Sequence, residues 1–137
     1  MLTSKLAKKV KYRLKKLKVV RPYEALYNKL IYKAKRKGIA ACLTYDEFCT
    51  LTSITECVYC AAKVEWCKYN PSKGGKSSRY NLDRKINSKS IGYTLNNLVV
   101  CCAECNLTRG DRFTHEEFLL IGEVIKKINL SRQFALV

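Results

Sequence analysis

The sequence predicts an α+β fold, in which two short antiparallel strands and one helix surround a zinc site and further α-helices flank this small core. Three observations predict it. Two Cys-x-x-Cys pairs, which begin at Cys57 and Cys102, supply four thiols with the spacing of a closed zinc site. Two strand-like segments lie between the pairs, and segments with helical periodicity precede and follow them. At 137 residues the chain is expected to form one modest domain, or a small domain with a basic appendage, whose small core a structural metal would stabilise.

The charge of the chain is strongly positive and unevenly distributed. The formal net charge is +16, and residues 1–40 carry 14 Lys or Arg against one acid, Glu24. Residues 51–137 carry 13 basic residues against 8 acidic ones. A field this positive favours a polyanion, so we expect DNA as the partner, with RNA not excluded. An anionic membrane surface or ribosome-like packing on RNA would also suit the charge, and charge alone does not distinguish these partners. No segment is apolar enough to span a bilayer, and we expect no membrane partner.

The eight cysteines indicate a reducing compartment. The first residues, Met1–Lys5, lack the apolar run of a signal peptide. We therefore expect a cytoplasmic protein, in the host cytosol if the chain is viral, whose thiols bind metal and do not pair as disulfides.

Residues 1–50 are predicted to form a basic, helical nucleic-acid-binding region. Its first helix covers residues 4–18, where apolar residues recur with helical period at Leu6, Val10, Leu14 and Leu17. Eight positive side chains and no acid lie between Lys5 and Lys18. This favours a helix that lies along phosphates over an ordinary packing helix with a solvated face. The candidate phosphate contacts on this helix are Lys8, Lys9, Lys11, Arg13, Lys15 and Lys16.

Two further helices complete this region. Pro22 is tolerated in a first helical turn, and Gly38 is a plausible stop for the helix that follows. The basic run before Gly38 either complements the helix dipole or contacts phosphate, and it adds three nucleic-acid-binding candidates: Lys35, Arg36 and Lys37. Thr44 and Glu47 form a capping-box pattern that opens a third, short helix.

Residues 51–130 are predicted to form the zinc-stabilised domain, followed by a tail at 131–137. Residues 70–78 form a polar loop by composition, which is no phosphate-binding loop because the first glycine of that motif would have to stand at Asn70. Residues 80–83 and 97–101 are expected to form the antiparallel strands, and residues 103–109 the core helix. Thr114 and Glu117 form a second capping box, which opens a last helix that packs across the core.

We assign the zinc ligands to the two knuckles: Cys57, Cys60, Cys102 and Cys105. Cys101 competes for one position, but it breaks the knuckle spacing and points to the other face of its strand. Cys42 and Cys49 match no second knuckle and are expected to be buried as small apolar residues, while Cys67 stays unassigned. A closed site of four thiolates has no open position, so the zinc holds the fold and the chemistry lies elsewhere.

Four segments in this order carry a family resemblance. They are C-V-Y-C from Cys57, N-L-D-R from Asn81, G-Y-T-L-N-N-L-V-V from Gly92 and C-A-E-C-N-L-T-R-G-D from Cys102. Together they resemble the HNH or His-Me finger endonucleases over residues 57–120, roughly half of the chain. The resemblance implies a ββα-metal fold that hydrolyses DNA phosphodiester bonds with Mg²⁺ or Mn²⁺, in addition to the structural Zn²⁺.

The resemblance also implies roles for single residues. Asp83 is the first ligand of the Mg²⁺ or Mn²⁺ ion and Asn106 is the second, and oxygen ligands suit such hard cations. Considered alone, Asp83 could instead pair with Arg84, and Asn106 could cap a helix. Asn97 matches the asparagine that braces the loop of the catalytic base, and the neighbouring Asn96 is the alternative.

The chain departs from the family at Arg84, where the usual pair is Asp-His. A guanidinium cannot act as a general base, although it can clamp a phosphate and stabilise developing charge. In lacking this histidine the chain is similar to PacI-like restriction enzymes, in which a tyrosine is thought to help activate the nucleophile. Tyr93 is the candidate for that role here, and Tyr80 is the alternative.

These observations favour a small, zinc-stabilised HNH-type DNA endonuclease, of the nicking, homing or restriction-like kind that is typical of phages and mobile elements. Arg109 and Arg112 are expected to contact the phosphate backbone, and His115, the single histidine, to serve the surface. Two alternatives stay open. The missing histidine favours a non-catalytic nucleic-acid-binding protein with a degenerate nuclease fold, and the order of the motifs also resembles a Holliday-junction resolvase. A homodimer is compatible with either nuclease.

Overall fold

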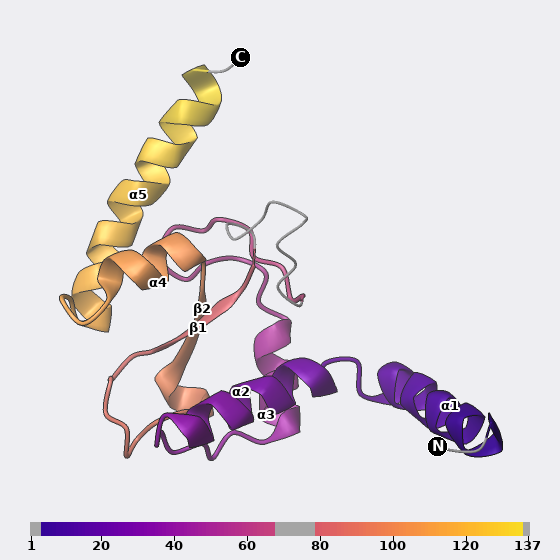
Figure 1. The fold of residues 1–137 in the computed structure, drawn as a ribbon. Helices are drawn as coiled ribbons and strands as arrows, with labels where there is room; N and C mark the ends of the chain where they lie inside the picture. Colours follow the sequence, from indigo (N-terminus) through magenta and orange to yellow (C-terminus); the bar gives the residue numbers. More distant parts are fainter. Residues whose placement is uncertain (1–3, 68–78, 136–137) are drawn as a thin grey trace.

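The computed structural model describes residues 4–67 and 79–135 (Figure 1). The polar loop predicted at residues 70–78 lies outside these ranges. The elements in chain order are α1 (Ser4–Val20), α2 (Glu24–Arg36), α3 (Tyr45–Thr52), β1 (Asn81–Arg84), the 3₁₀ turn η2 (Leu95–Asn97), β2 (Leu98–Cys101), α4 (Ala103–Arg109) and α5 (His115–Ala135). The mixture of helices with one small sheet confirms the α+β class.

The sheet consists of β1 and β2, which pair antiparallel with Leu82 opposite Val100 and Asp83 opposite Val99. The chain turns from β2 directly into α4, so that two strands and one helix follow each other as the sequence predicted. Every residue of β2 is buried, and its apolar side chains, with β-branched Val99 and Val100 at the centre, suit a strand covered on both faces.

The core forms around β2 and draws on both sides of residue 50, where we predicted a domain boundary. Phe48 of α3, Val100 of β2 and Phe118 of α5 are almost fully buried in one cluster. Leu26 of α2 and Leu43 join the same cluster. The helices α2 and α3 therefore pack on the same core as the strands.

Capping residues fix the helix ends where the sequence placed them. Thr44 and Glu47 form a reciprocal capping box at α3, and Thr114 and Glu117 make the same pair of hydrogen bonds at α5. Gly38 follows α2 with φ +65°, the left-handed conformation that favours glycine at a helix end.

Cys42 was expected to be buried but is exposed, and Cys49 is half-buried.

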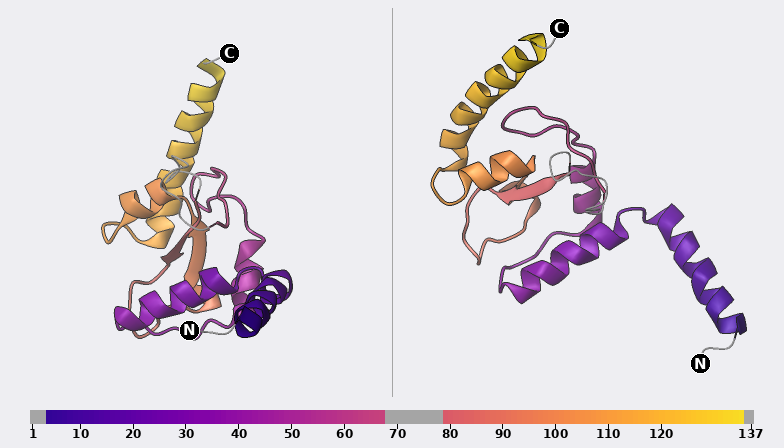
Figure 2. Two further views of the ribbon diagram at one scale, coloured as in Figure 1. Left: turned by 45° about the vertical axis from the view of Figure 1, so that its right-hand side comes forward. Right: turned by 45° about the horizontal axis from the view of Figure 1, so that its top comes forward.

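The two long terminal helices project from different sides of this core, α5 upward and α1 to the right in the view of Figure 1 (Figures 1 and 2). The described side chains of α1 are all exposed. The first half of α5 packs on the core through Phe118 and Gly122, whereas its second half extends away and runs to Ala135, into the residues predicted as a tail. Within the described ranges, no helix combines the length and the apolar character needed to cross a membrane.

Candidate functional site

The four cysteines of the two knuckles converge on one point. Their sulfur atoms all lie within 4.8 Å of one another, and all four side chains are buried. A zinc ion with four thiolates at about 2.3 Å needs sulfurs about 3.8 Å apart, and Cys60 Sγ lies 3.7 Å from Cys102 Sγ. The donors are of the soft type that zinc prefers, so the cluster fits a closed structural zinc site.

Local backbone geometry builds the two knuckles. In the first, the amide of Ala61 donates to the carbonyl of Cys57 at 2.9 Å, and Ala61 takes the left-handed conformation with φ +60°. In the second, Cys102 is the N-cap of α4, and its sulfur accepts from the amide of Cys105 at 3.4 Å. A tight turn and a helix start therefore direct the pairs of sulfurs toward one another.

The thiols of this cluster share charge unequally. Hydrogen bonds from Cys102 and Cys105 lower the pKa of the Cys57 thiol, whereas hydrogen bonds with Cys102 and Cys57 raise the pKa of Cys105. Cys101, the rival ligand, is fully buried outside the cluster, and burial raises the pKa of its thiol. A bound cation is the charge that would stabilise these clustered sulfurs together as thiolates.

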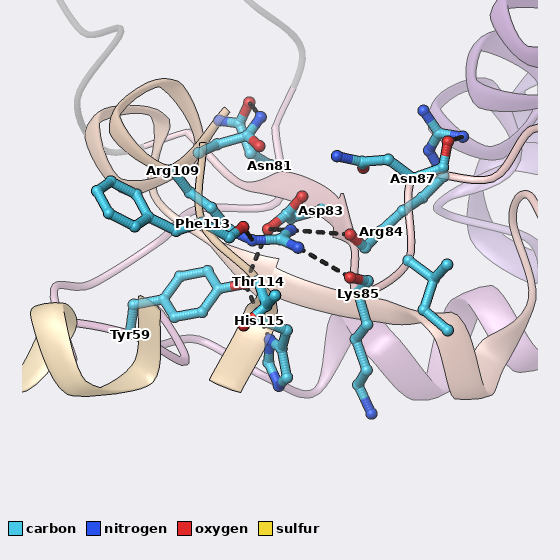
Figure 3. A network of polar contacts seen from close by, with 12 residues as sticks. Tyr59, Asn81, Asp83, Arg84, Lys85, Asn87, Arg109, Phe113, Thr114 and His115 are labelled. Carbon is cyan, nitrogen blue, oxygen red and sulfur yellow. Dashed lines mark hydrogen bonds and ion pairs between the residues drawn. The ribbon is translucent and has the colours of Figure 1, made fainter. Parts of the chain in front are cut away.

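Asp83 lies at the centre of a second cluster, on β1 (Figure 3). Its Oδ2 atom accepts a hydrogen bond from the Tyr59 hydroxyl at 2.8 Å and another from Nη1 of Arg109 at 2.5 Å. The Asp83 side chain is 9% exposed and that of Arg109 is 2% exposed, so the pair is a buried salt bridge. Both of these hydrogen bonds use Oδ2, which leaves Oδ1 as the oxygen through which Asp83 would bind a cation.

Arg109, the last residue of α4, links this helix to the end of β1, to the loop that follows β1 and to the turn before α5. In addition to the bond to Asp83, its guanidinium donates to the carbonyls of Arg84 and Lys85 at 2.8 Å and to that of Phe113 at 3.2 Å. The sequence placed Arg109 against phosphate. Its position is different, because its donors face carbonyls and a carboxylate inside the protein and not the surface.

Asn106 lies on the same side of the strand pair as Asp83. Its amide nitrogen is 3.4 Å from Oδ1 of Asn81, and Asn81 and Asp83 share one face of β1 because side chains two residues apart point the same way. The contact uses the N–H of Asn106 and not its carbonyl oxygen. A carboxylate oxygen and an amide oxygen on one face are the donor types that a hard divalent cation takes.

Asn97 braces the loop between β1 and η2. Its carboxamide accepts from the amide of Ile86 at 3.0 Å and donates to the carbonyls of Ile86 and Gly92 at 3.1 and 2.9 Å. Asn97 is buried, whereas the alternative, Asn96, is exposed. The loop conformation therefore depends on Asn97.

Arg84 and Tyr93 meet away from Asp83. The Arg84 guanidinium lies 5.8 Å from the centre of the Tyr93 ring, and its Nη1 is 3.4 Å from the carbonyls of Asn87 and Ser88. Tyr93 is anchored by its backbone, which bonds to Ala40 and Cys42. The alternative tyrosine, Tyr80, stacks on Trp66 with ring centres 4.1 Å apart.

The remaining predicted contacts to nucleic acid lie at the surface. On α1 the side chains of Lys8, Lys9, Lys11, Arg13, Lys15 and Lys16 are exposed, as are Lys35, Arg36 and Lys37 at the end of α2. Arg112, in the turn after α4, is also exposed. These positions leave the cationic groups free to approach a polyanion.

His115 belongs to the Asp83 cluster, although the sequence placed it at the surface. Its Nδ1 atom lies 3.0 Å from the Tyr59 hydroxyl, and the two rings make an edge contact with centres 5.6 Å apart. Burial lowers the pKa of His115, and the charges of Lys85 and Arg109 act in the same direction. No pattern in the sequence predicted a role for Tyr59, whose pKa is raised by burial and by the hydrogen bond to Asp83. The capping box at Thr114 was the available signal, because it places His115 on the first turn after Arg109.

Comparisons with known proteins give one clear result for the fold. No family model matches the chain, and no curated protein matches it. Among solved structures, the chain is similar to the rare-cutting HNH restriction endonuclease PacI, whose structure was described for its mechanism of DNA perturbation. The TM-score is 0.62 at 23% sequence identity, and the match covers 78% of this chain and 78% of that chain. An identity this low bears on the fold alone, and the chain has an HNH-like fold.

Proposed function

We propose that this protein is a zinc-stabilised endonuclease that hydrolyses DNA phosphodiester bonds with a divalent metal, Mg²⁺ or Mn²⁺. The observation that carries the proposal is the placement of Asp83 and Asn106 on one face of an HNH-like strand pair and helix. The four-cysteine cluster at the start of the same helix supports a structural Zn²⁺ beside them.

The chain's own residues divide the work of the reaction. Asp83 Oδ1 and the Asn106 carbonyl would hold the ion, which when bound neutralises charge that develops on the scissile phosphate. Arg84 carries a planar guanidinium that can clamp a phosphate oxygen. Tyr93 lies beside Arg84 and is the residue proposed to help activate the nucleophile, and Asn97 holds the loop that links these two residues.

DNA is the proposed substrate, and the exposed cations support it. The helix α1 carries eight Lys or Arg and no acid, and its described side chains are open to solvent. Each phosphate that such a helix neutralises releases counterions, so the affinity should fall steeply with salt. The phage or mobile-element setting, and the nicking, homing or restriction-like role, rest on the family resemblance.

Cleavage of supercoiled plasmid by the zinc-loaded protein, with Mg²⁺ or Mn²⁺, tests the proposal. We expect nicked or linear product from the wild type, and a loss of at least about 100-fold in rate from Asp83→Ala or Asn106→Ala. Lys8→Ala, on α1 and outside the proposed metal site, is the control. It should weaken DNA binding and reduce its salt dependence but leave the metal requirement unchanged. Wild-type protein that binds DNA yet cuts nothing with either metal would refute the nuclease.

Two observations favour a second candidate, a nucleic-acid-binding protein with a degenerate nuclease fold. The Asp83 carboxylate is already paired with the Arg109 guanidinium, and Arg84 stands where the family has its base. A neighbouring cation reduces the attraction of a carboxylate for a metal ion. Isothermal titration with Mn²⁺ separates the candidates, because the nuclease requires Mn²⁺ binding that Asp83→Ala removes.

Branched DNA in the cleavage assay tests the junction resolvase, which would cut junctions in preference to the plasmid.

The proposed protein can act as a homodimer through the outer face of α5. Leu120, Val124 and Ile128 recur every four residues along this face and are 73, 56 and 44% exposed. The acids of α5 lie in its first half and most of its bases in the second: Glu116, Glu117 and Glu123, then Lys126, Lys127 and Arg132. An antiparallel pair centred on Val124 would therefore bury apolar residues and run the acidic half of each helix along the basic half of the other.

Sedimentation of the zinc-loaded protein tests this arrangement without reference to activity. We expect a dimer that Val124→Glu converts to a monomer. A monomeric wild type, or a dimer that Val124→Glu leaves intact, would contradict the arrangement.

A further inference from the structure

Three residues from distant parts of the chain, His115, Tyr59 and Asp83, form a continuous line of hydrogen bonds that ends at the proposed metal-binding carboxylate. The Tyr59 hydroxyl lies between Oδ2 of Asp83, at 2.8 Å, and Nδ1 of His115, at 3.0 Å (Figure 3). Tyr59 is 2% exposed and His115 is half-buried. The line therefore runs from a partly solvated imidazole, through a buried phenol, to the carboxylate.

The chemistry of the groups fixes the direction of each hydrogen bond. Asp83 also receives the Arg109 guanidinium, so its carboxylate is the acceptor and the Tyr59 hydroxyl is the donor. The single hydroxyl proton of Tyr59 is then used, and Tyr59 can only accept from the imidazole. His115 must donate from Nδ1, which places its proton there in the neutral ring and leaves Nε2 as the basic nitrogen.

The position of His115 is set by two features of α5. The capping box at Thr114 fixes the first turn of the helix, with hydrogen bonds of 2.8 and 3.1 Å between Thr114 and Glu117. One turn further on, Gly122 lies directly against the backbone of Tyr59, where an added Cβ would come within 2.4 Å of the Tyr59 carbonyl oxygen. The close approach at Gly122 holds the helix, and with it the imidazole, against Tyr59.

We propose that His115 is a positioning residue of the nuclease centre, which holds the Asp83 carboxylate through Tyr59 so that Oδ1 faces the metal. The inference deepens the proposed function and rests on it. The chain lacks the family's histidine beside the metal-binding aspartate, and its single histidine acts on the same aspartate from α5. Outer partners of this kind typically change metal affinity or activity by about 10- to 100-fold.

Protonation of Nε2 makes this contribution depend on pH. The groups that face His115 are Tyr59, the cations Lys85 and Arg109, and the anions Glu116 and Asp83. A second proton adds positive charge at the end of the line and strengthens the pull of Tyr59 on Asp83, which weakens the carboxylate as a metal ligand. We therefore expect the metal-dependent rate to fall on the acid side of neutrality.

Nitrogen NMR of the zinc-loaded full chain tests the line directly, because the chain has one histidine. We expect the ring proton on Nδ1 in wild type and loss of that preference in Tyr59→Phe. Added Mg²⁺ should shift the His115 ring signals in wild type and leave them unchanged in Tyr59→Phe. A proton on Nε2, or a Mg²⁺ response that survives Tyr59→Phe, would overturn the proposal whether or not the protein cuts DNA.

Cleavage kinetics supply the matched pair of variants. His115→Ala removes the donor and should lower the rate about 10- to 100-fold. His115→Asn keeps an N–H near the Nδ1 position without a titrating ring, so it should recover most of the rate and lose the acid-side fall. If the wild type cuts and His115→Ala cuts equally fast, this inference fails while the nuclease stands. If the wild type cuts nothing with either metal, the proposed function fails and the inference falls with it.

Discussion

The two polar clusters beside the β1–β2 pair differ in what they need in order to form. The cysteine cluster gathers four like groups that only a cation can satisfy together. The Asp83 cluster gathers unlike groups that satisfy one another, a carboxylate with a guanidinium and a phenol. The first is therefore expected to fold with its ion, and the second to fold without one and to bind an ion only for function.

The largest effect should follow loss of the zinc. Binding of structural zinc contributes about 10–16 kcal/mol in small zinc domains, which exceeds the stability of most domains. We expect Cys105→Ala, or treatment with a strong chelator, to unfold the core. Denaturant titration followed by circular dichroism, with zinc content measured in parallel, gives the result.

The neighbouring Cys101 provides the control for that prediction. Cys101 and Cys105 are buried to the same degree, but only Cys105 belongs to the cluster. Cys101→Ala should retain zinc and cost about 1 kcal/mol, as an ordinary core truncation does. If both variants lost the same free energy of unfolding, packing and not metal binding would account for the stability of the region around the cysteine cluster.

The next largest effect should follow loss of Arg109. Removal of one partner from a buried ion pair typically costs about 3–5 kcal/mol, because the other charge is left without compensation. Arg109→Met keeps the bulk of the side chain but leaves the buried Asp83 carboxylate without its cation. We therefore expect a loss of stability of this size with the zinc still bound. Arg112→Met, an exposed change three residues away, should alter stability by no more than about 0.5 kcal/mol. A small loss in Arg109→Met would show that Asp83 does not depend on it.

The two clusters also differ in how far the sequence predicted them. The four cysteines could be identified because the two-residue spacing within each pair already determines where the sulfurs point. The strands and helix starts followed from equally local signals, such as the capping boxes at Thr44 and Thr114. Local chemistry was enough for these features.

The partners of Asp83 were not predictable in this way. Tyr59, Arg109 and His115 are 24 to 32 residues away from Asp83 in sequence, and each has a common local explanation. Arg109 closes a helix, and His115 opens one. Only the packing of α4 and α5 over the strands determines that these polar side chains turn inward, and no spacing in the chain encodes it.

A smaller effect on stability should follow loss of Asn97, which braces the loop between β1 and η2. Its carboxamide makes three hydrogen bonds to the loop after β1, and loss of buried partners leaves groups that cost about 1–3 kcal/mol. Asn97→Ala should lower stability by this amount, and more rapid hydrogen exchange of the Ile86 amide should accompany it. Asn96→Ala is the exposed control and should do neither. If both variants behave alike, the loop is held by its backbone.

The smallest effect should be the pH dependence that His115 gives to stability. Burial lowers its pKa below the ordinary value of 6.5, so the unfolded chain takes up the proton first as the pH falls. The contribution of the neutral ring is fully present above pH 6.5 and is lost as the pH falls toward the lowered folded value. Denaturant titrations between about pH 5 and 7.5 should therefore show falling stability in wild type and a flatter profile in His115→Asn. Since the chain has no other histidine, a fall that persists in His115→Asn would have to come from the cysteine cluster losing zinc to protons, which parallel zinc measurements would reveal.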